Sequence, residues 1–306
     1  MDFINALPKI ELHAHLNGSL SNSTLLKLRK LKYGDSEATD IEPAFYQILE
    51  SDNLSLTDCF LKFKYAHNLT DSWDALKLAT ECMIEDFARE KTVYLEIRIN
   101  RADGPEAAKE NLDVTLKLMQ KYPDIIKGMD LSGDPLKYTF RDFISVFTEA
   151  RNSGLGIALH AAEVQEKYED VTDILEFGPD RIGHGTFIEE SGIKNWQTLV
   201  SKKIPIECCL TSNVKCGTVK NYDDHHFKKL FEMGHPVTIC TDDFGVFGTS
   251  LSQEIYLSAS HHKISNIDLV KIMKQSVDCS FASDTEKKAL KEIFDKFCIE
   301  NNFHLM

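Results

Sequence analysis

Seven short apolar runs alternate along the chain with longer amphipathic stretches, and this alternation limits the possible folds most strongly. The runs are rich in β-branched residues and are apolar along their length, as expected of strands with both faces buried. They lie at residues 10–16, 92–99, 125–132, 155–161, 181–185, 204–212 and 236–242. Strands that alternate with helices predict an α/β fold with a parallel sheet.

The stretches between the runs follow a helical period. Residues 71–91 and 105–122 are two examples, and the second begins with Pro105, which suits the first turn of a helix. Closing helices are predicted at 249–263, 266–278 and 283–298. No repeat, low-complexity tract or linker rich in Pro, Gly and Ser interrupts the pattern. The sequence therefore predicts one domain over residues 1–306.

The alternation fits either an open doubly wound sheet or a closed (β/α)₈ barrel. The glycine fingerprints GxGxxG, after the first run, and GxxxxGK[ST], anywhere, are both missing. Residues capable of chemistry stand at the carboxyl ends of most runs: His13, His15, 132–134, His160, His184, 211–213, Asp242 and Asp243. In a barrel these ends share one mouth, whereas the outer strands of an open sheet lie too far apart to cooperate. The polar residues therefore favour the barrel.

Composition limits the partners and the compartment. A formal net charge of −13 argues against a general surface for nucleic acid polymers or acidic membranes, although a small anionic substrate needs only a local site. The eight cysteines lack CxxC spacing and lie mostly in apolar runs, as is typical of reduced, buried cysteines. No secretory leader and no apolar run of membrane-spanning length is visible. We expect a soluble, cytoplasmic protein, and a monomer.

Three of the runs end in candidate metal ligands, which are His13, His15, His160 and Asp242. His13 and His15 are two residues apart, so in a strand both imidazoles point to the same face. Taken singly, each residue has a structural alternative, such as a core histidine for His160 or a helix N-cap for Asp242. Taken together, three imidazoles and one carboxylate suit Zn²⁺ with a position left for water.

Other residues at the same predicted mouth are candidates for acting on a substrate. Glu163 lies in a loop after the fourth run, where a shielded carboxylic acid can hold a proton near neutral pH and donate it. His184 is flanked by glycines that let a ligand approach, although a turn histidine would look the same. In extended chain, Asp243 would point away from Asp242 and so meet the substrate. Gly133 either offers a backbone N–H to a ligand or forms a tight turn.

Six motifs together resemble those of the adenosine deaminase superfamily: HAHLNGSL, DLSGDP, HAAE, RIGHGT, LTSN and CTDDFGVF. The longer segments LPKIELHAHLNGS and CTDDFGVFGTSLSQEIY resemble the adenosine deaminase-like branch, the N6-methyl-AMP deaminases. The resemblance covers most of the chain. It implies a TIM-type (β/α)₈ metallo-dependent hydrolase barrel. It also implies hydrolytic deamination at purine C6, which converts N6-methyl-AMP and related N6-substituted AMP to IMP and an amine.

The resemblance further implies a role for each catalytic residue. His13, His15, His160 and Asp242 would bind one zinc ion per chain, and zinc would lower the pKa of a water so that hydroxide attacks C6. Glu163 would protonate the ring nitrogen N1. His184 would accept the water's proton and stabilise the hydroxide. The H-x-E and P-C-x-x-C zinc motifs of cytidine deaminases are absent from the sequence.

Substrate contacts are implied in the same way. Asp243 would hydrogen-bond N7, the Gly133 N–H would meet N3, and His15 would also face the substrate. Asn17 stands where adenosine deaminases usually carry Asp, and an uncharged amide tolerates a 5′-phosphate better than a carboxylate does. His67 matches a substrate-contacting histidine of the branch, although a histidine that merely ends a helix is an equal alternative.

The sequence departs from the family near residues 98–100. Seven strands are predicted, whereas a closed barrel of this type has eight. In the family a loop, a helix and a further strand follow the position of Arg98, but here Ile99 and Asn100 follow directly. We expect one strand–helix unit, the third strand, of roughly 30 residues to be missing. The missing loop is where the branch holds the 5′-phosphate, and Asn100 stands where the branch usually has Asp. The expected result is an intact catalytic set with weakened nucleotide affinity and lowered stability.

Other functions remain open from the sequence alone. One is an adenosine deaminase that acts on the free nucleoside, and another is a catalytically impaired variant of the same family. A different zinc hydrolase of this barrel, acting on amides or esters, commonly carries a carboxylated lysine, and no strand-end lysine is found here. A silent relative that serves as a binding or regulatory protein is the last alternative.

Overall fold

The structure, a computed structural model, describes residues 1–34, 44–50, 54–99 and 103–303. The chain divides into two compact units, each made of segments that are distant in sequence. The first unit comprises Met1–Ile99, Cys209–Gly217 and Ile239–Val270. The second comprises Asn100–Cys208, Thr218–Thr238 and Lys271–Met306.

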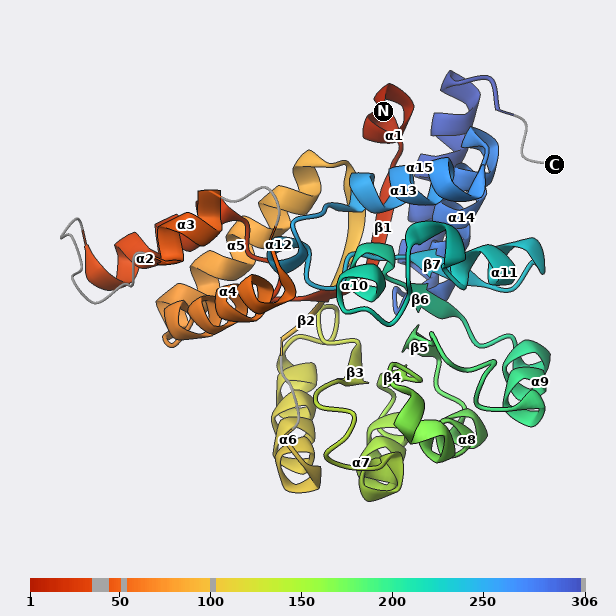
Figure 1. Cartoon of the computed structure of the whole chain (residues 1–306), viewed down its shortest axis with the longest axis horizontal. Coiled ribbons are helices and arrows are strands. Elements are labelled where there is room, and N and C mark those ends of the chain that lie inside the picture. The colour runs from red at the N-terminus through yellow and green to blue at the C-terminus, as the bar shows by residue number, and fades with distance from the viewer. Residues whose placement is uncertain (35–43, 51–53, 100–102, 304–306) are drawn as a thin grey trace. The chain divides into compact units, whose positions relative to one another are not determined.

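The first unit contains a two-stranded parallel sheet of β1 (Lys9–His15) and β2 (Thr92–Arg98). The pairing is irregular at two points: β2 carries one extra residue opposite the step from Lys9 to Ile10, and β1 carries one extra residue between Glu11 and Ala14, as in a β-bulge. The helices of this unit are α1 (Asp2–Ala6), α2 (Asn22–Tyr33), α3 (Ala44–Glu50), α4 (Leu56–Leu69), α5 (Trp73–Arg89), α10 (Leu210–Lys215), α12 (Phe244–Phe247) and α13 (Leu251–His262) (Figure 1).

Serine side chains fix where several helices of the first unit begin. Ser55 and Asp58 form a capping box at the start of α4, and Ser72 accepts a hydrogen bond from a backbone N–H at the start of α5. Such caps satisfy N–H groups that have no partner inside the helix. They help set the bounds of the two long helices that follow β1 in the chain.

The second unit contains most of a five-stranded sheet in the order β3 (Gly128–Leu131), β4 (Gly156–Ala161), β5 (Arg181–His184), β6 (Ile206–Cys208) and β7 (Val237–Ile239). The pairs from β3 to β6 are parallel. Its helices are α6 (Pro105–Lys121), α7 (Phe140–Asn152), α8 (Tyr168–Phe177), α9 (Ile193–Lys202), α11 (Phe227–Glu232) and α15 (Asp284–Glu300), and the short 3₁₀ turns are η1 (Gln165–Lys167) and η2 (Tyr222–Asp224). The unit boundary falls inside β7 and inside α14 (Asn266–Cys279).

The strand and helix pattern predicted from the sequence is confirmed. Each of the seven runs contains a strand, and the five predicted helices correspond to α5, α6, α13, α14 and α15. One run was predicted too long, since β6 ends at Cys208 and residues 211–213 lie in α10 instead of a strand. The backbone turns at this point because the Thr211 N–H donates to the buried Glu254 carboxylate, at 3.0 Å.

The described residues between β2 and β3 form α6 and no further strand, in agreement with the expected seven strands. Asn100 lies outside the described residues. Strand pairing gives two separate sheets, so closure into a barrel and the single domain both stay predictions.

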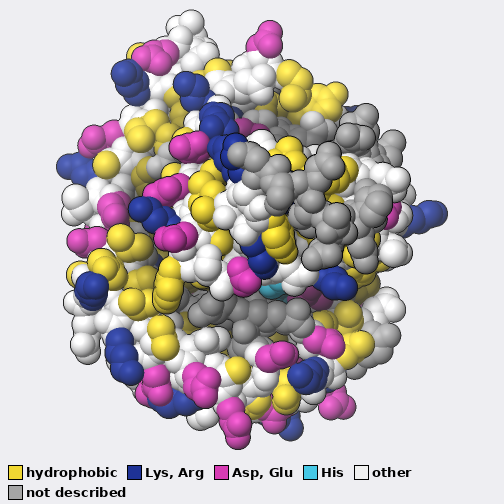
Figure 2. Space-filling model, turned by 90° about the vertical axis from the view of Figure 1, so that its left-hand side faces the viewer, with side chains coloured by type: hydrophobic (Ala, Val, Ile, Leu, Met, Phe, Trp, Pro, Cys, Tyr) yellow, Lys and Arg dark blue, Asp and Glu magenta, His cyan; other side chains and the backbone are white. Residues whose placement is uncertain are grey.

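The cysteines agree with the expectation of buried thiols. All eight are free, and Cys59, Cys82, Cys208, Cys209, Cys240 and Cys298 are buried, whereas Cys216 is exposed. None of the helices in the described ranges has the length and apolar character that a membrane crossing requires. Figure 2 shows one face of the molecule, on which acidic and basic side chains are intermingled with hydrophobic ones.

A buried cation and an aromatic ring pack against the amino-terminal ends of β3 and β4. The Arg181 guanidinium donates to Glu207 at 2.6 Å and lies 3.8 Å from the centre of the Phe281 ring. The ring covers Gly128 and Gly156, and a Cβ on Gly156 would come within 2.4 Å of it. The two strands therefore begin with glycine because the ring occupies the space of a side chain.

We predict that Gly156→Ala lowers the free energy of unfolding by about 1–3 kcal/mol, because the added methyl group overpacks this site. In a Phe281→Ala background the same change should cost much less, since the obstructing ring is gone. Urea unfolding of the four proteins measures both costs. An equal cost of Gly156→Ala in the two backgrounds would contradict the assigned contact.

Candidate metal centre and active site

The carboxyl end of β1 brings two imidazoles together. The Nε2 atoms of His13 and His15 lie 3.3 Å apart, as their spacing in a strand predicts. His13 is fully buried, whereas His15 is partly exposed. Two lone-pair nitrogens this close to each other suit a shared cation or proton.

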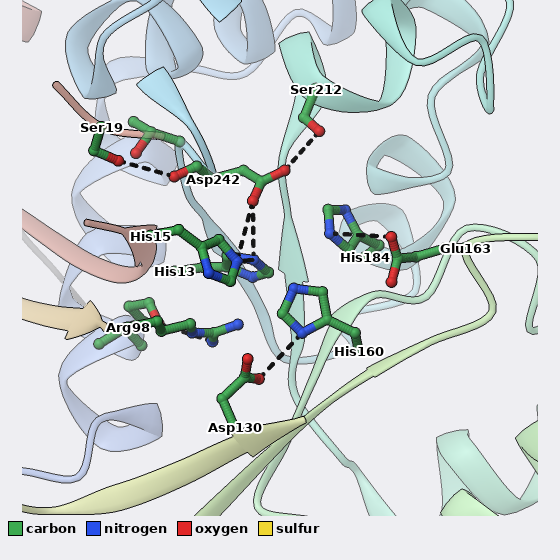
Figure 3. Close-up of polar contacts among 12 residues, drawn as sticks. His13, His15, Ser19, Arg98, Asp130, His160, Glu163, His184, Ser212 and Asp242 are labelled. Atoms are coloured by element: carbon green, nitrogen blue, oxygen red, sulfur yellow. Dashed lines mark hydrogen bonds and ion pairs between the residues drawn. The ribbon is translucent and has the colours of Figure 1, made fainter. Parts of the chain in front are cut away.

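Asp242 completes a triangle of donor atoms in the first unit (Figure 3). Its Oδ1 lies 3.3 Å from His13 Nε2 and 3.4 Å from His15 Nε2. Ligand atoms about 2.0–2.1 Å from a tetrahedral zinc ion are about 3.3–3.4 Å from one another. The three atoms therefore match one face of a zinc tetrahedron in size, and their chemistry fits the same ion.

The backbone of Asp242 is left-handed, with φ of 61°. The extended conformation expected for this residue is therefore wrong. Its N–H donates to the His13 carbonyl at 2.8 Å, and its own carbonyl accepts from the His15 N–H at 3.1 Å and from Ser19 Oγ at 3.1 Å. A non-glycine residue in this region costs about 1–3 kcal/mol, and these hydrogen bonds hold it there.

Ser212 fixes which carboxylate oxygen of Asp242 faces the histidines. Its hydroxyl donates to Oδ2 at 2.7 Å, which leaves Oδ1 directed toward the two imidazoles. Ser212 lies in the LTSN motif, but the sequence alone did not assign it this role.

Asp243 begins α12 and packs against the turn after β1. A Cβ on Gly18 would lie 1.6 Å from Asp243 Oδ1, so only glycine leaves room for this carboxylate. The Asn-Gly pair after β1 thus has a packing reason in addition to its turn tendency.

Asn17 and His67, both predicted to contact substrate, meet in the first unit. The Asn17 amide nitrogen lies 2.8 Å from His67 Nδ1. Since an amide nitrogen only donates, Nδ1 accepts and the proton of neutral His67 resides on Nε2. His67 also lies near the end of α4, so the two readings of this residue are compatible.

The second unit positions His160 by a carboxylate. His160 extends from β4, and its Nδ1–H donates to Asp130 Oδ1 on β3 at 3.1 Å. A histidine whose Nδ1 is held in this way is oriented to present Nε2 to a metal. Asp130 is not among the site residues predicted from the sequence, although an acidic residue inside the apolar strand predicted at 125–132 indicates a polar role.

His184 and Glu163 face each other in the second unit, with His184 Nε2 3.9 Å from Glu163 Oε2 (Figure 3). His184 is buried and left-handed at the end of β5, and its carbonyl accepts a hydrogen bond from His226 Nε2 at 2.8 Å. Ala162 is left-handed too and turns the chain from β4 toward Glu163. Gly133, with φ of 142°, occupies a turn after β3 that favours glycine.

The predicted site residues thus fall into two sets. Those of the first unit are His13, His15, Asn17, His67, Asp242 and Asp243, and those of the second are Gly133, His160, Glu163 and His184. Hydrogen bonds to neighbouring elements hold Asp242, and the pair of Asn17 and His67, in the first set, and His160 in the second.

The sequence model of the family described as adenosine deaminase matches residues 8–108 and 100–297. The chain belongs to the adenosine deaminase family. The resemblance seen in the motifs is therefore confirmed, and the family indicates a hydrolytic deaminase. The match is in two parts, which meet where a strand–helix unit is expected to be missing.

Curated relatives cover nearly the whole chain. An adenosine deaminase-like protein of Drosophila melanogaster is 36% identical over 93% of this chain and 94% of its own length. The N6-methyl-AMP deaminase of Homo sapiens is 34% identical over 95% of this chain and 93% of its own length.

Solved structures agree with these relatives. The apo N6-methyl-AMP deaminase of Arabidopsis thaliana has a TM-score of 0.86 at 32% identity and covers 98% of this chain and 99% of its own. An Arabidopsis structure described as ADAL complexed with IMP has a TM-score of 0.85 at 32% identity, covering 98% of this chain and 99% of its own. The fold of this chain is that of the deaminases.

The side chain of His226 makes the stability of the folded protein depend on pH. Burial lowers the pKa of His226 to about 4, and its neighbours are His184 and the stacked ring of His225, 4.3 Å away. Because the folded pKa lies below the usual value of about 6.5, the contribution of neutral His226 is complete above pH 6.5 and is lost as the pH falls toward 4.

We predict that His226→Gln, whose amide can still donate to the His184 carbonyl, loses less stability than wild type between pH 7 and pH 5. The full linkage effect is up to about 3 kcal/mol. Urea unfolding at several pH values measures it. Parallel pH profiles for the two proteins would refute the assignment.

Proposed function

We propose that this protein is a zinc-dependent hydrolase that converts N6-methyl-AMP, and related N6-substituted AMP, to IMP and an amine. The proposed metal site is supported above all by the triangle of His13 Nε2, His15 Nε2 and Asp242 Oδ1, which lie 3.3–3.4 Å from one another. The family and the named relatives support the reaction class.

We propose that His13, His15, His160 and Asp242 bind the same ion, one per chain. His160 supports this because the hydrogen bond from its Nδ1 to Asp130 fixes the orientation of the imidazole. Bound zinc supplies an electrophile that lowers the pKa of a water and makes it a nucleophile near neutral pH.

Glu163 and His184 are proposed to divide the proton transfers between them. His184 accepts the proton of the attacking water, and Glu163 donates a proton to purine N1, so that charge does not accumulate on the ring as C6 is attacked. A distance of 3.9 Å between His184 Nε2 and Glu163 Oε2 supports this proposal, because the two groups are neighbours in the second unit. Asp243 is assigned to N7 and the Gly133 N–H to N3.

A nucleotide substrate is favoured over a nucleoside by the pair of Asn17 and His67. The Asn17 amide is uncharged and does not repel a 5′-phosphate, and its nitrogen lies 2.8 Å from His67 Nδ1. Relatives are named for N6-methyl-AMP, and solved neighbours are described as complexes with GMP and IMP. Deamination of the free nucleoside is the second candidate, because the expected loss of a strand–helix unit falls at the phosphate loop of the branch.

We predict that Glu163→Gln retains zinc and loses about 10²–10⁴-fold in turnover of N6-methyl-AMP, because the amide keeps the shape but cannot donate the proton. Methylamine release measures turnover, and elemental analysis measures zinc. The matched control is Glu169→Gln, the same change at an exposed position of α8, which should act as wild type.

The same assays test the metal site and the alternatives. Changing both His13 and His15 to Ala should remove most of the roughly one zinc per chain expected of a single site. Full zinc occupancy in that variant, or near-normal turnover in Glu163→Gln, would refute the corresponding role. Zinc without any amine release from wild type would favour a silent relative.

We also predict that restoring a strand–helix unit after Arg98, taken from the human relative, raises the melting temperature and lowers KM for N6-methyl-AMP. Restored strand pairing satisfies backbone groups that cost about 1–3 kcal/mol each when buried without partners. A Gly/Ser insert of equal length at the same position is the control and should do neither. Equal melting temperature and equal kcat/KM before and after restoration would show that no unit is missing.

A further inference from the structure

Glu11 is a wholly buried acid in the middle of β1, and it lies outside every role assigned so far. Both of its carboxylate oxygens accept hydrogen bonds. Oε1 accepts from the His13 N–H at 2.8 Å, and Oε2 accepts from the Thr241 N–H at 3.0 Å and from the Thr241 hydroxyl at 2.8 Å. A buried charge is costly unless it is satisfied in this way.

The three donors identify what Glu11 holds together. His13 is itself a candidate zinc ligand, and Thr241 directly precedes Asp242, the candidate ligand from the other segment. The pairing of β1 with β2 is irregular between Glu11 and Ala14, so the backbone around His13 is not fixed by a regular ladder on that side. The Glu11 carboxylate bridges the two ligand-bearing segments at this irregular point.

We propose that Glu11 is a positioning residue that fixes the His13 and Asp242 segments relative to each other and so sets the geometry of the His13, His15 and Asp242 triangle before a metal binds. This inference rests on the proposed zinc site. The short separations in the triangle support it, because the three donor atoms already have the spacing of a zinc tetrahedron.

Only a carboxylate satisfies all three donors. Glutamine has one accepting oxygen and one amide group that donates, so in Glu11→Gln the amide faces either the His13 N–H or the two donors of Thr241. The hydrogen bonds to either His13 or Thr241 must then break. Burial raises the pKa of Glu11 to about 7 even though the three hydrogen bonds act against this rise, so the test is run at pH 8.

The experiment titrates metal-free protein with Co²⁺, whose visible absorption reports tetrahedral coordination, and then displaces Co²⁺ with Zn²⁺. We expect Glu11→Gln to bind Co²⁺ about 10–100-fold more weakly, the range found when groups that orient metal ligands are removed. We also expect its absorption bands to change in position or intensity, because the ligand geometry relaxes. Loss of stability alone would not move these bands in the folded protein.

Two further variants make the test specific. Thr241→Val removes one of the three donors and should weaken Co²⁺ binding by a smaller factor than Glu11→Gln does. In the double variant, the loss of Co²⁺ affinity should be smaller than the product of the two single losses, because both changes affect the same set of hydrogen bonds. The control is Glu90→Gln, another acid of the first unit, which accepts from the Ser252 N–H and hydrogen-bonds to none of the ligands. It should bind Co²⁺ within about two-fold of wild type.

The outcomes are distinct. Wild-type affinity and wild-type bands in Glu11→Gln would overturn the positioning role while leaving the zinc proposal intact. Failure of wild type to bind Co²⁺ or Zn²⁺ would overturn both. If Glu11→Gln does not fold, Thr241→Val decides the matter, and unchanged binding in that variant overturns the role.

Discussion

Backbone hydrogen bonds join β1 to the segment at Asp242. The arrangement of the candidate ligands in the first unit depends on this contact. Asp242 donates to the His13 carbonyl and accepts from the His15 N–H, so the same two residues that supply imidazoles also hold the carboxylate. The ligand side chains cannot separate without breaking these backbone hydrogen bonds. The hydrogen bonds to His13 and His15, together with the one from Ser19, hold Asp242 in its left-handed conformation.

Several buried acidic residues of this protein join segments of the chain through hydrogen bonds. Glu254 in α13 is wholly buried, and it accepts from the Thr211 N–H in α10 and from the Thr249 hydroxyl. Glu207 in β6 pairs with Arg181 of the neighbouring strand. Hydrogen bonds from backbone and hydroxyl donors in the first case, and an ion pair in the second, make burial of the charge tolerable. By fixing Thr211, Glu254 also fixes the helix from which Ser212 reaches Asp242.

The sequence predicted the strands well and singled out the candidate ligands, because both leave local signals. An apolar run bounded by helices identifies a strand, and two histidines two residues apart identify a shared face. The prediction from sequence failed where the local structure depends on residues that are distant in the chain. The residues 211–213 read as part of a strand, and only the buried Glu254, more than 40 residues later, explains the helix there. Likewise Asp130, Ser212 and Glu11 are ordinary polar residues in sequence, and their roles follow from neighbours that only the fold supplies.

In each unit, one candidate metal ligand has its second polar atom hydrogen-bonded to a neighbouring side chain. Without that hydrogen bond, the second polar atom could compete for the metal or let the side chain rotate. Ser212 occupies Oδ2 of Asp242, and Asp130 occupies Nδ1 of His160. A side chain held at one end loses little further freedom when its other end binds, so the ordering cost that would weaken metal binding has been met during folding. The sequence therefore specifies both the candidate ligands and two residues, Ser212 and Asp130, that restrict the motion of two of them.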